Sequence, residues 1–193
     1  INQYQYRMFL DLEMTLQHSR YEKEEIIQVG AFLVDKYDNL IWNYNHFIKP
    51  TLIQNVSKRT LQFLNITAAK INNGINYHEL YEAFKKTLLR YKPLVIVWGN
   101  NDKFAIDKSY KVNPIFHHND FLNLQQVLKV YYNFNYELGL FTTAKIFQID
   151  CGKQVHNAYE DALLTRKIFN SFYKIANNNL DFDFEKIMKH NLN

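Results

Sequence analysis

An unbroken apolar run in the middle of the chain, Leu94-Val95-Ile96-Val97-Trp98, constrains the fold more than any other segment. Strands that are apolar at every position are covered on both faces, as in a parallel sheet with helices packed on either side. Three further strands are predicted upstream, over residues 6–14, 26–34 and 40–48, with short polar turns between them. Such short connections indicate an antiparallel meander.

Helices are predicted between and after these strands. Asn76 and Glu79 have the spacing of a capping box, and Pro93 is expected to end the helix that begins there. The other expected elements are short helical turns between 57 and 70 with a loop at 65–67, helices over 102–110, 121–132, 139–147 and 157–176, and a short strand near 114–116. This order predicts an α/β fold with a mixed five-stranded sheet, in which a three-stranded antiparallel meander and two parallel strands are flanked by helices.

The composition is that of a folded domain. Apolar residues make up 47% of the 193 residues and charged residues 22%, which excludes a disordered chain. We expect one domain over residues 1–176 and a polar C-terminal tail over 177–193. Aromatic residues reach 16%; most are expected to fill the core, and a minority could stack on nucleic-acid bases.

The net charge and the cysteine content limit which binding partners and which cellular compartment are expected. A formal charge of +4 is compatible with a polyanionic partner without requiring one. The lone Cys151 excludes an intramolecular disulfide and argues against a structural zinc site. The sequence has no apolar run of the roughly 20 residues that a membrane helix needs, and it begins with polar residues rather than a signal peptide. We therefore expect a soluble cytoplasmic domain and, since there is no initial Met, a trimmed N-terminus.

Two carboxylates interrupt the first predicted strand. Asp11 and Glu13 alternate with Leu10 and Leu12, so both acids point to one face of the sheet. Buried carboxylates are costly unless a positive charge accompanies them. A third acid, Asp102, lies four residues past the apolar run, at the carboxyl end where open α/β sheets bind their ligands.

A fourth acid lies at the start of the last predicted helix. Asn157 and Glu160 have the spacing of an N-cap and its partner in the first turn, so the helix should begin at Ala158 and leave His156 on the preceding loop. Asp161 then lies on the stripe that packs against the sheet, where an acid needs a partner. We expect that partner to be a cation shared with Asp11.

Four carboxylates and a nearby histidine suit a site for two divalent cations that cleaves phosphodiesters. Oxygen ligands without cysteine favour Mg²⁺ or Mn²⁺ over Zn²⁺. His156 is suited to take a proton from the attacking water. The competing interpretation of Asp11 and Glu13 is a pair of solvated acids on an edge strand; the other two acids weigh against it.

Three motifs carry a family resemblance. They are Phe9-Leu10-Asp11-Leu12-Glu13-Met14-Thr15, Trp98-Gly99-x-x-Asp102 and His156-x-Ala158-x-x-Asp161-Ala162, supported by Glu25-Ile26-Ile27-Gln28-Val29-Gly30 and Phe63-Leu64-Asn65-Ile66-Thr67. Together they resemble the DEDDh family of exonucleases in the ribonuclease-H-like superfamily, most closely its branch of ERI-like RNA-trimming and bacterial sporulation-inhibitor exonucleases. The sequence departs from the family at Asn65, where relatives have Gly, and at Asn123, where many have Asp and where we expect a helix cap.

The resemblance implies an activity. It implies a 3′–5′ exonuclease that hydrolyses single-stranded 3′ ends and releases nucleoside 5′-monophosphates. The residues that it implies as metal ligands are Asp11, Glu13, Asp102 and Asp161, with Glu13 and His156 catalytic and His156 as the general base. The candidate substrate contacts are Leu12, Met14, Thr15, Leu64, Trp98 and Asn101, with Met14 and Thr15 at the terminal nucleotide and Leu64 as a wedge against its base.

Three questions stay open at this point. The alternative function is a nucleic-acid-binding or regulatory module that has the exonuclease fold without turnover, because a fold alone does not establish a function. A protein distinguishes RNA from DNA by contacting the 2′-hydroxyl, and no residue pattern identifies that contact. Only the branch resemblance favours RNA. For Trp98, packing in the core competes with a substrate role.

Overall fold

The protein is built on one five-stranded sheet with the strand order β3-β2-β1-β4-β5. The structure is a computed structural model that describes residues 1, 3–16, 24–51, 56–102, 120–152 and 156–178. The strands are β1 Tyr6–Met14, β2 Ile26–Asp35, β3 Leu40–Phe47, β4 Leu94–Val97 and β5 Phe121–Asn123. The helices are α1 Lys58–Leu64, α2 Ala68–Asn72, α3 Tyr77–Tyr91, α5 Leu124–Tyr131, α6 Leu140–Ile146 and α7 Ala158–Asn177.

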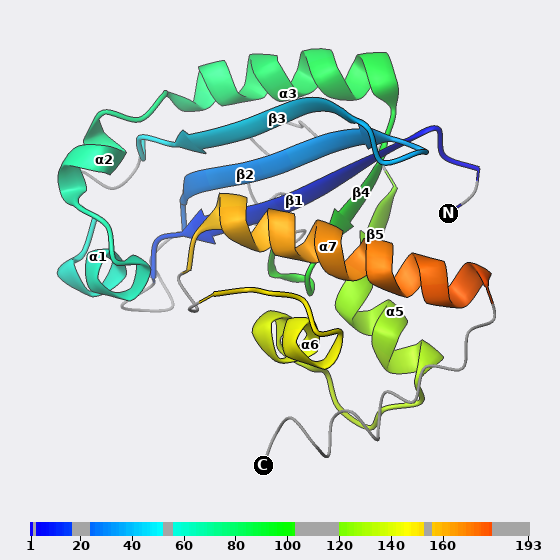
Figure 1. The fold of residues 1–193 in the computed structure, drawn as a ribbon. Helices are drawn as coiled ribbons and strands as arrows, with labels where there is room; N and C mark the ends of the chain where they lie inside the picture. The colour runs from blue at the N-terminus through cyan, green and yellow to red at the C-terminus, as the bar shows by residue number, and fades with distance from the viewer. Residues whose placement is uncertain (2, 17–23, 52–55, 103–119, 153–155, 179–193) are drawn as a thin grey trace.

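The sheet is mixed, as the sequence predicted. β1 pairs antiparallel with β2, and β2 pairs antiparallel with β3, which forms the expected meander. β4 lies parallel to β1 on its other side, and β5 continues the parallel half. The predicted α/β class with a three-stranded meander and two parallel strands is therefore confirmed (Figure 1).

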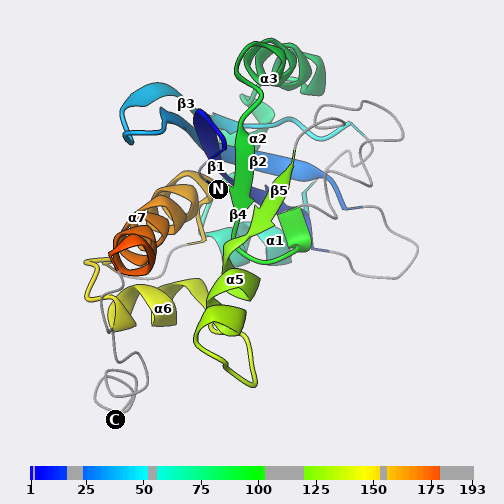
Figure 2. The ribbon, with the colours of Figure 1, turned by 90° about the vertical axis from the view of Figure 1, so that its right-hand side faces the viewer.

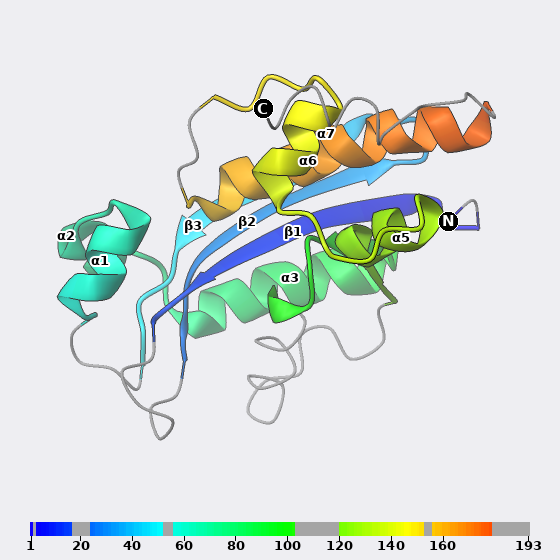
Figure 3. The same ribbon diagram turned by 90° about the horizontal axis from the view of Figure 1, so that it is seen from below.

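Helices cover both faces of the sheet. α3 lies over one face, while α7 with α5 and α6 lies over the other, as the end-on view in Figure 2 and the view from below in Figure 3 show. Leu10 and Leu12 pack with Phe84 of α3, whereas Phe9 packs with Phe169 of α7. All residues of β4 are buried. The central strands thus separate two apolar cores, which explains the unbroken apolar run of β4.

Local signals determine where the two long helices begin. Asn76 caps α3 with a complete capping box, in which its side chain accepts from the Glu79 N–H at 3.0 Å and the Glu79 carboxylate accepts from the Asn76 N–H at 2.8 Å. α3 ends at Tyr91, just before Pro93. α7 begins at Ala158 because the Asn157 side chain accepts from the N–H groups of the first turn. Both predicted starts are confirmed.

The fifth strand differs from the prediction. β5 occupies residues 121–123, where a helix was expected to begin, and α5 starts only at Leu124. Asn123 is the N-cap of α5, as predicted, since its side chain accepts from the Gln126 N–H at 3.2 Å. The strand predicted near 114–116 and nearly all of the helix predicted over 102–110 lie outside the described residues.

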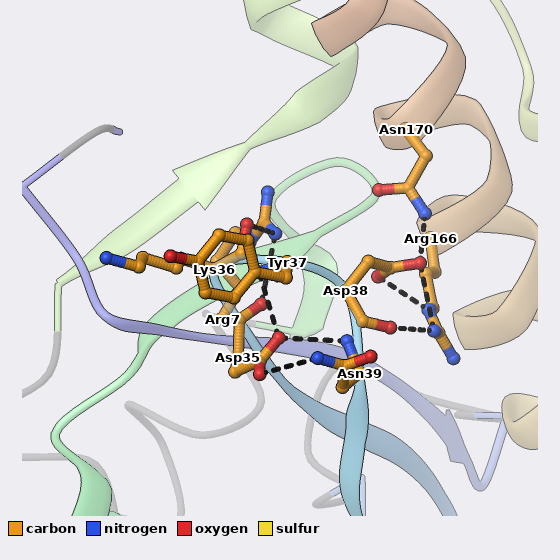
Figure 4. A network of polar contacts seen from close by, with 8 residues as sticks. All are labelled: Arg7, Asp35, Lys36, Tyr37, Asp38, Asn39, Arg166 and Asn170. Atoms are coloured by element: carbon orange, nitrogen blue, oxygen red, sulfur yellow. Dashed lines mark hydrogen bonds and ion pairs between the residues drawn. The ribbon is translucent and has the colours of Figure 1, made fainter.

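The turn between β2 and β3 is tied to its surroundings by arginine side chains (Figure 4). Arg166 of α7 donates to both carboxylate oxygens and to the carbonyl oxygen of Asp38, at 2.8–3.0 Å. Asn170, one helical turn later, donates to the same carboxylate at 2.7 Å. Arg7 of β1 donates to the carbonyl oxygens of Asp35 and Lys36. α7 is thereby joined to the meander at the far end of β2.

The C-terminal region follows α7. α7 ends at Asn177, and most of the tail expected over 177–193 lies outside the described residues, so the proposed domain boundary stays a prediction. Among the helices that the structure describes, none has the length and apolar character needed to cross a membrane.

Candidate active site

β1 brings the first two candidate ligands to the face that α7 covers. Asp11 and Glu13 alternate with Leu10 and Leu12, whose side chains belong to the opposite core under α3. Glu13 is buried and Asp11 partly so. In Figure 1, β1 ends between α1 and the first turn of α7, so segments far apart in sequence meet here.

Asp102 reaches the same point from the end of β4. It is buried, and its carboxylate accepts a hydrogen bond from the Leu12 N–H at 3.1 Å. This N–H lies between the two acids of β1, so Asp102 is fixed beside both. The turn before Asp102 is held in place by Asn123, which accepts from the Gly99 N–H and donates to the Asn100 side chain, both at 3.1 Å.

Asp161 is positioned by an unusually close approach of α7 to β2. Gly30 pairs with Asp11 across the strands, and a Cβ atom at Gly30 would lie 2.2 Å from the carbonyl oxygen of Ala158. The Gln28 side chain, opposite Glu13, accepts from the Ala158 N–H at 3.4 Å. Gly30 therefore marks a close backbone approach rather than a bulge, since the register shifts of β2 with its partners lie at other positions.

Three of the predicted residues form a compact group. Ligand atoms of Glu13, His156 and Asp161 all lie within 4.8 Å of one another. One carboxylate oxygen of Asp161, Oδ1, is buried and has no hydrogen-bond partner in the part of the chain that the structure describes. A buried acceptor without a donor is costly, and a divalent cation would satisfy it. Asp11, expected to share that cation, is outside this compact group.

Burial and mutual repulsion disfavour the charged forms of the two β1 acids. Loss of solvation is the main reason that the pKa of Asp11 lies well above its ordinary range, and repulsion from Asp102, Asp161 and Glu13 adds to it. Burial likewise raises the pKa of Glu13 to about 8, with further contributions from Asp161 and Asp102. Because Asp102, Asp161 and Glu13 all raise the pKa of Asp11, the four acids form one electrostatic cluster.

Burial also raises the pKa values of the other two acids, Asp102 and Asp161, and backbone hydrogen bonds oppose the increase. Burial raises the pKa of Asp102 to about 7, although the N–H donated by Leu12 opposes the shift. Burial also raises the pKa of Asp161 to about 7; repulsion from Glu160 adds to the shift and the Asn157 backbone opposes it. Divalent cations bound by oxygen ligands would reverse these shifts. The donor set consists of four carboxylates and an imidazole, and one Asp161 oxygen has no hydrogen-bond partner within the described residues. This set therefore fits divalent metal ions.

Two predicted substrate contacts do not face this cluster. Leu64 is 2% exposed and packs with Ile27 and Ile71 in a small core beneath α1 and α2, so it cannot wedge against a base, which corrects the expectation. The side chain of Leu12 is buried on the α3 side of the sheet, and its N–H already binds Asp102. Helix packing, which a seven-residue helix does not reveal by periodicity, decided the orientation of Leu64.

The other candidate contacts have varied surroundings. Thr15 is buried, and its hydroxyl accepts from the Glu25 N–H at 3.0 Å, which closes the junction between β1 and β2. Met14 is partly buried against the α3-side core, and Trp98 packs against the core on the α7 side. Asn101 is exposed. Of these four, Asn101 is the side chain most open to solvent.

Three residues with evident roles at the site were not assigned one from the sequence. Gln28 and Asn123 hold the backbone segments that carry Asp161 and Asp102. Phe63, adjacent to the buried Leu64, is 48% exposed and its ring stacks on His156. Spacing in the sequence cannot reveal such contacts, because each joins segments that are distant along the chain.

Solved exonuclease structures share this fold. The chain matches the nuclease domain of 3'hExo, a DEDDh family member bound to rAMP, with a TM-score of 0.73 and 12% identity over 93% of this chain and 95% of that one. Cell-death related nuclease 4 (CRN-4) matches with a TM-score of 0.71 and 18% identity, over 90% of this chain and 64% of that one. E. coli exonuclease I in complex with a dT13 oligonucleotide matches with a TM-score of 0.72 and 16% identity, over 91% of this chain and 42% of that one. The predicted ribonuclease-H-like architecture is confirmed.

Sequence comparison leads to a family. No curated protein matches the chain significantly. The family model described as Exonuclease (RNase_T) matches residues 8–169, which run from β1 into the second half of α7 and contain all four acids and the histidine. This chain therefore belongs to the exonuclease family.

Proposed function

We propose that the protein is a metal-dependent 3′–5′ exonuclease that removes nucleoside 5′-monophosphates from single-stranded 3′ ends, with RNA preferred over DNA. One observation carries the proposal. Segments from β1, the end of β4 and the start of α7 bring four mutually repelling carboxylates together. The compact group of Glu13, His156 and Asp161 includes a buried oxygen that has no hydrogen-bond partner among the described residues. Such an arrangement is unfavourable without cations and suits two-metal hydrolysis with them.

The acids and the histidine have separate roles in this proposal. Asp11, Glu13, Asp102 and Asp161 hold two divalent cations, Mg²⁺ or Mn²⁺. When bound, these ions lower the pKa of water and offset the negative charge that develops on the phosphodiester. Asp102 is locked to the backbone of β1 and Asp161 to the capped start of α7, so both ligands are oriented before any ion binds.

His156 is the proposed general base. Its imidazole lies within 4.8 Å of the carboxylates of Glu13 and Asp161. It accepts the proton of the attacking water while the new bond to phosphorus forms and the bond to the 3′ oxygen of the preceding nucleotide breaks. The terminal nucleotide leaves as a 5′-monophosphate, and the 3′ oxygen of the shortened strand takes up a proton from solvent to become a hydroxyl. The imidazolium then returns its proton to solvent.

The comparisons support this class of substrate. One matching structure holds rAMP, and another shows a 3′-exonuclease recognising the 3′ end of a histone mRNA stem-loop. A third holds a dT13 oligonucleotide. The net charge of +4 agrees with a polyanionic substrate. The resemblance to the ERI-like branch is our reason for proposing RNA, and DNA is the other outcome of the test.

The test follows 5′-labelled RNA and DNA oligonucleotides of the same sequence in Mg²⁺, in Mn²⁺ and in chelator. We expect stepwise shortening of RNA from its 3′ end that requires a metal, with 5′-monophosphates as products. Asp161→Asn should lower the rate by more than about a thousandfold, because it removes a ligand charge from a site that acts as a unit. Glu160→Gln, a change at an exposed acid in the same helical turn, should stay within about threefold of the wild type.

The results separate the alternatives. RNA that binds but stays at full length in both metals would support the non-catalytic module and overturn the enzyme proposal. Faster degradation of DNA than of RNA would overturn only the substrate preference. A near-normal rate in Asp161→Asn would overturn the assignment of the site.

A further inference from the structure

An exposed aromatic ring on α1 lies against the proposed general base. The ring of Phe63 stacks on the imidazole of His156 with centroids 4.2 Å apart and an interplanar angle of 24°. We propose that Phe63 is a positioning residue that sets the plane of the His156 ring and keeps it within reach of Glu13 and Asp161. The kinetic consequence rests on the proposed exonuclease function, whereas the stack itself does not.

α1 is well anchored for such a role. Its N-cap, Ser57, accepts from the Thr60 N–H at 3.2 Å, and the Thr60 hydroxyl accepts from the Leu16 N–H at 3.1 Å. This second bond ties α1 to the chain just beyond β1, the strand that carries Asp11 and Glu13. Leu64 is buried beneath the helix, so the adjacent Phe63 points outward from a fixed support.

The end of α1 is fixed as well. Asn65 adopts the left-handed conformation with φ +51°, and its N–H donates to the last turn of the helix. Asparagine is among the residues that accept this conformation, so it can replace glycine at a helix C-terminus. The backbone that carries Phe63 is therefore held on both sides.

Among the described residues, none forms the hydrogen bond that usually fixes the orientation of a catalytic imidazole ring at His156. In catalytic and metal sites, one imidazole nitrogen commonly donates to a carboxylate or carbonyl that fixes the ring orientation. Within the described ranges, neither nitrogen of His156 has a hydrogen bond, and the residue lies just outside α7. Near-parallel ring contact at this distance is favourable and restricts rotation. The stack therefore supplies the orientation that a hydrogen bond would otherwise provide.

Kinetics can distinguish positioning from substrate contact. Phe63→Ala and Phe63→Leu, which both remove the ring, should lower kcat about tenfold and leave KM unchanged, while Phe63→Tyr should restore kcat to within about twofold. A rise in KM with unchanged kcat would mean that Phe63 contacts the substrate, and it would overturn the proposal. Leu89→Ala, at a 63% exposed residue of α3 on the opposite face, is the control for truncating an exposed apolar side chain.

A measurement without substrate tests the stack directly. In the NMR spectrum, the imidazole C–H signals of His156, assigned through their loss in His156→Asn, should be shifted upfield by the Phe63 ring. The shift should disappear in Phe63→Ala and Phe63→Leu, persist in Phe63→Tyr and be unaffected by Leu89→Ala. Unchanged signals in Phe63→Ala would overturn the proposal. Because this readout needs no turnover, an intact stack in a protein that proves inactive would count against the exonuclease assignment alone.

Discussion

Single carboxyl groups at this site titrate far from their ordinary range. In the folded protein the pKa of Glu13 is about 8 and that of Asp161 about 7, while ordinary values apply after unfolding. Between about pH 4 and pH 8 the folded state therefore binds more protons than the unfolded state. The contribution of these groups to the free energy of unfolding is fully present at low pH and is lost as the pH rises through the folded pKa.

Thermal unfolding at pH 6 and pH 8, in chelator and in Mn²⁺, should reveal this contribution. We expect Mn²⁺ to raise the unfolding temperature more at pH 8, where more of the repelling carboxylates are charged. In chelator, Asp161→Asn should be more stable than the wild type at pH 8, by an amount on the order of 2 kcal/mol, because it removes one buried charge. It should also lose most of the Mn²⁺ effect. An equal Mn²⁺ effect at both pH values in the wild type would contradict this account.

At the scale of elements, β2 and α7 approach so closely at Gly30 that no side chain fits between them. Gly30→Ala would place a methyl group 2.2 Å from the Ala158 carbonyl oxygen, so the helix must shift. We expect a loss of about 3 kcal/mol in the free energy of unfolding, measured by chemical denaturation, and a large fall in nuclease rate because Asp161 moves. Gly139→Ala is the control, since its Cβ would meet only the Thr142 hydroxyl at 3.9 Å. Equal effects of the two changes would refute the close-approach argument.

Asn123 offers a separate test at the same scale. Asn123→Ala removes the cap of α5 together with the bonds to Gly99 and Asn100, so it should lower both stability and nuclease rate. Asn76→Ala removes the cap of α3, which lies on the opposite face of the sheet. We expect each change to cost about 1 kcal/mol of stability. Only Asn123→Ala should reduce the rate, by about tenfold; similar rates in the two variants would argue against a role in placing Asp102.

The sequence predicted elements well where a local signal determined them. Alternation in residues 6–14 correctly put both acids on one face, and Asn157 correctly marked the start of α7. β5 was missed because three half-buried residues have no readable period, and its position depends on pairing with β4. The orientation of Leu64 depended on packing against Ile27, a contact that spacing along the chain does not encode.

At the scale of the whole molecule, α7 contacts the sheet at a second point besides Gly30, and this point lies far from the four acids. Its Arg166 binds Asp38 in the β2–β3 turn, and both side chains are partly exposed, at 17% and 31%. Asp38 has φ +69°, so Asp38→Gly removes the side chain without straining the backbone. In a double-mutant cycle with Arg166→Ala, we expect a coupling of about 1 kcal/mol in stability and an unchanged nuclease rate. A coupling near zero would mean that the contact in Figure 4 does not stabilise the fold.

The hydrogen bond from Leu12 to Asp102 spans 90 positions, and Asp161 lies a further 59 positions along the chain. Contacts of such long range are slow to form, because the entropy of closing a long loop must be lost before the contact is made. A growing polypeptide that already contains β1 therefore has no complete ligand set until the start of α7 has been synthesised and docked. A chain interrupted before α7 would contain Asp11, Glu13 and Asp102 but lack the fourth ligand.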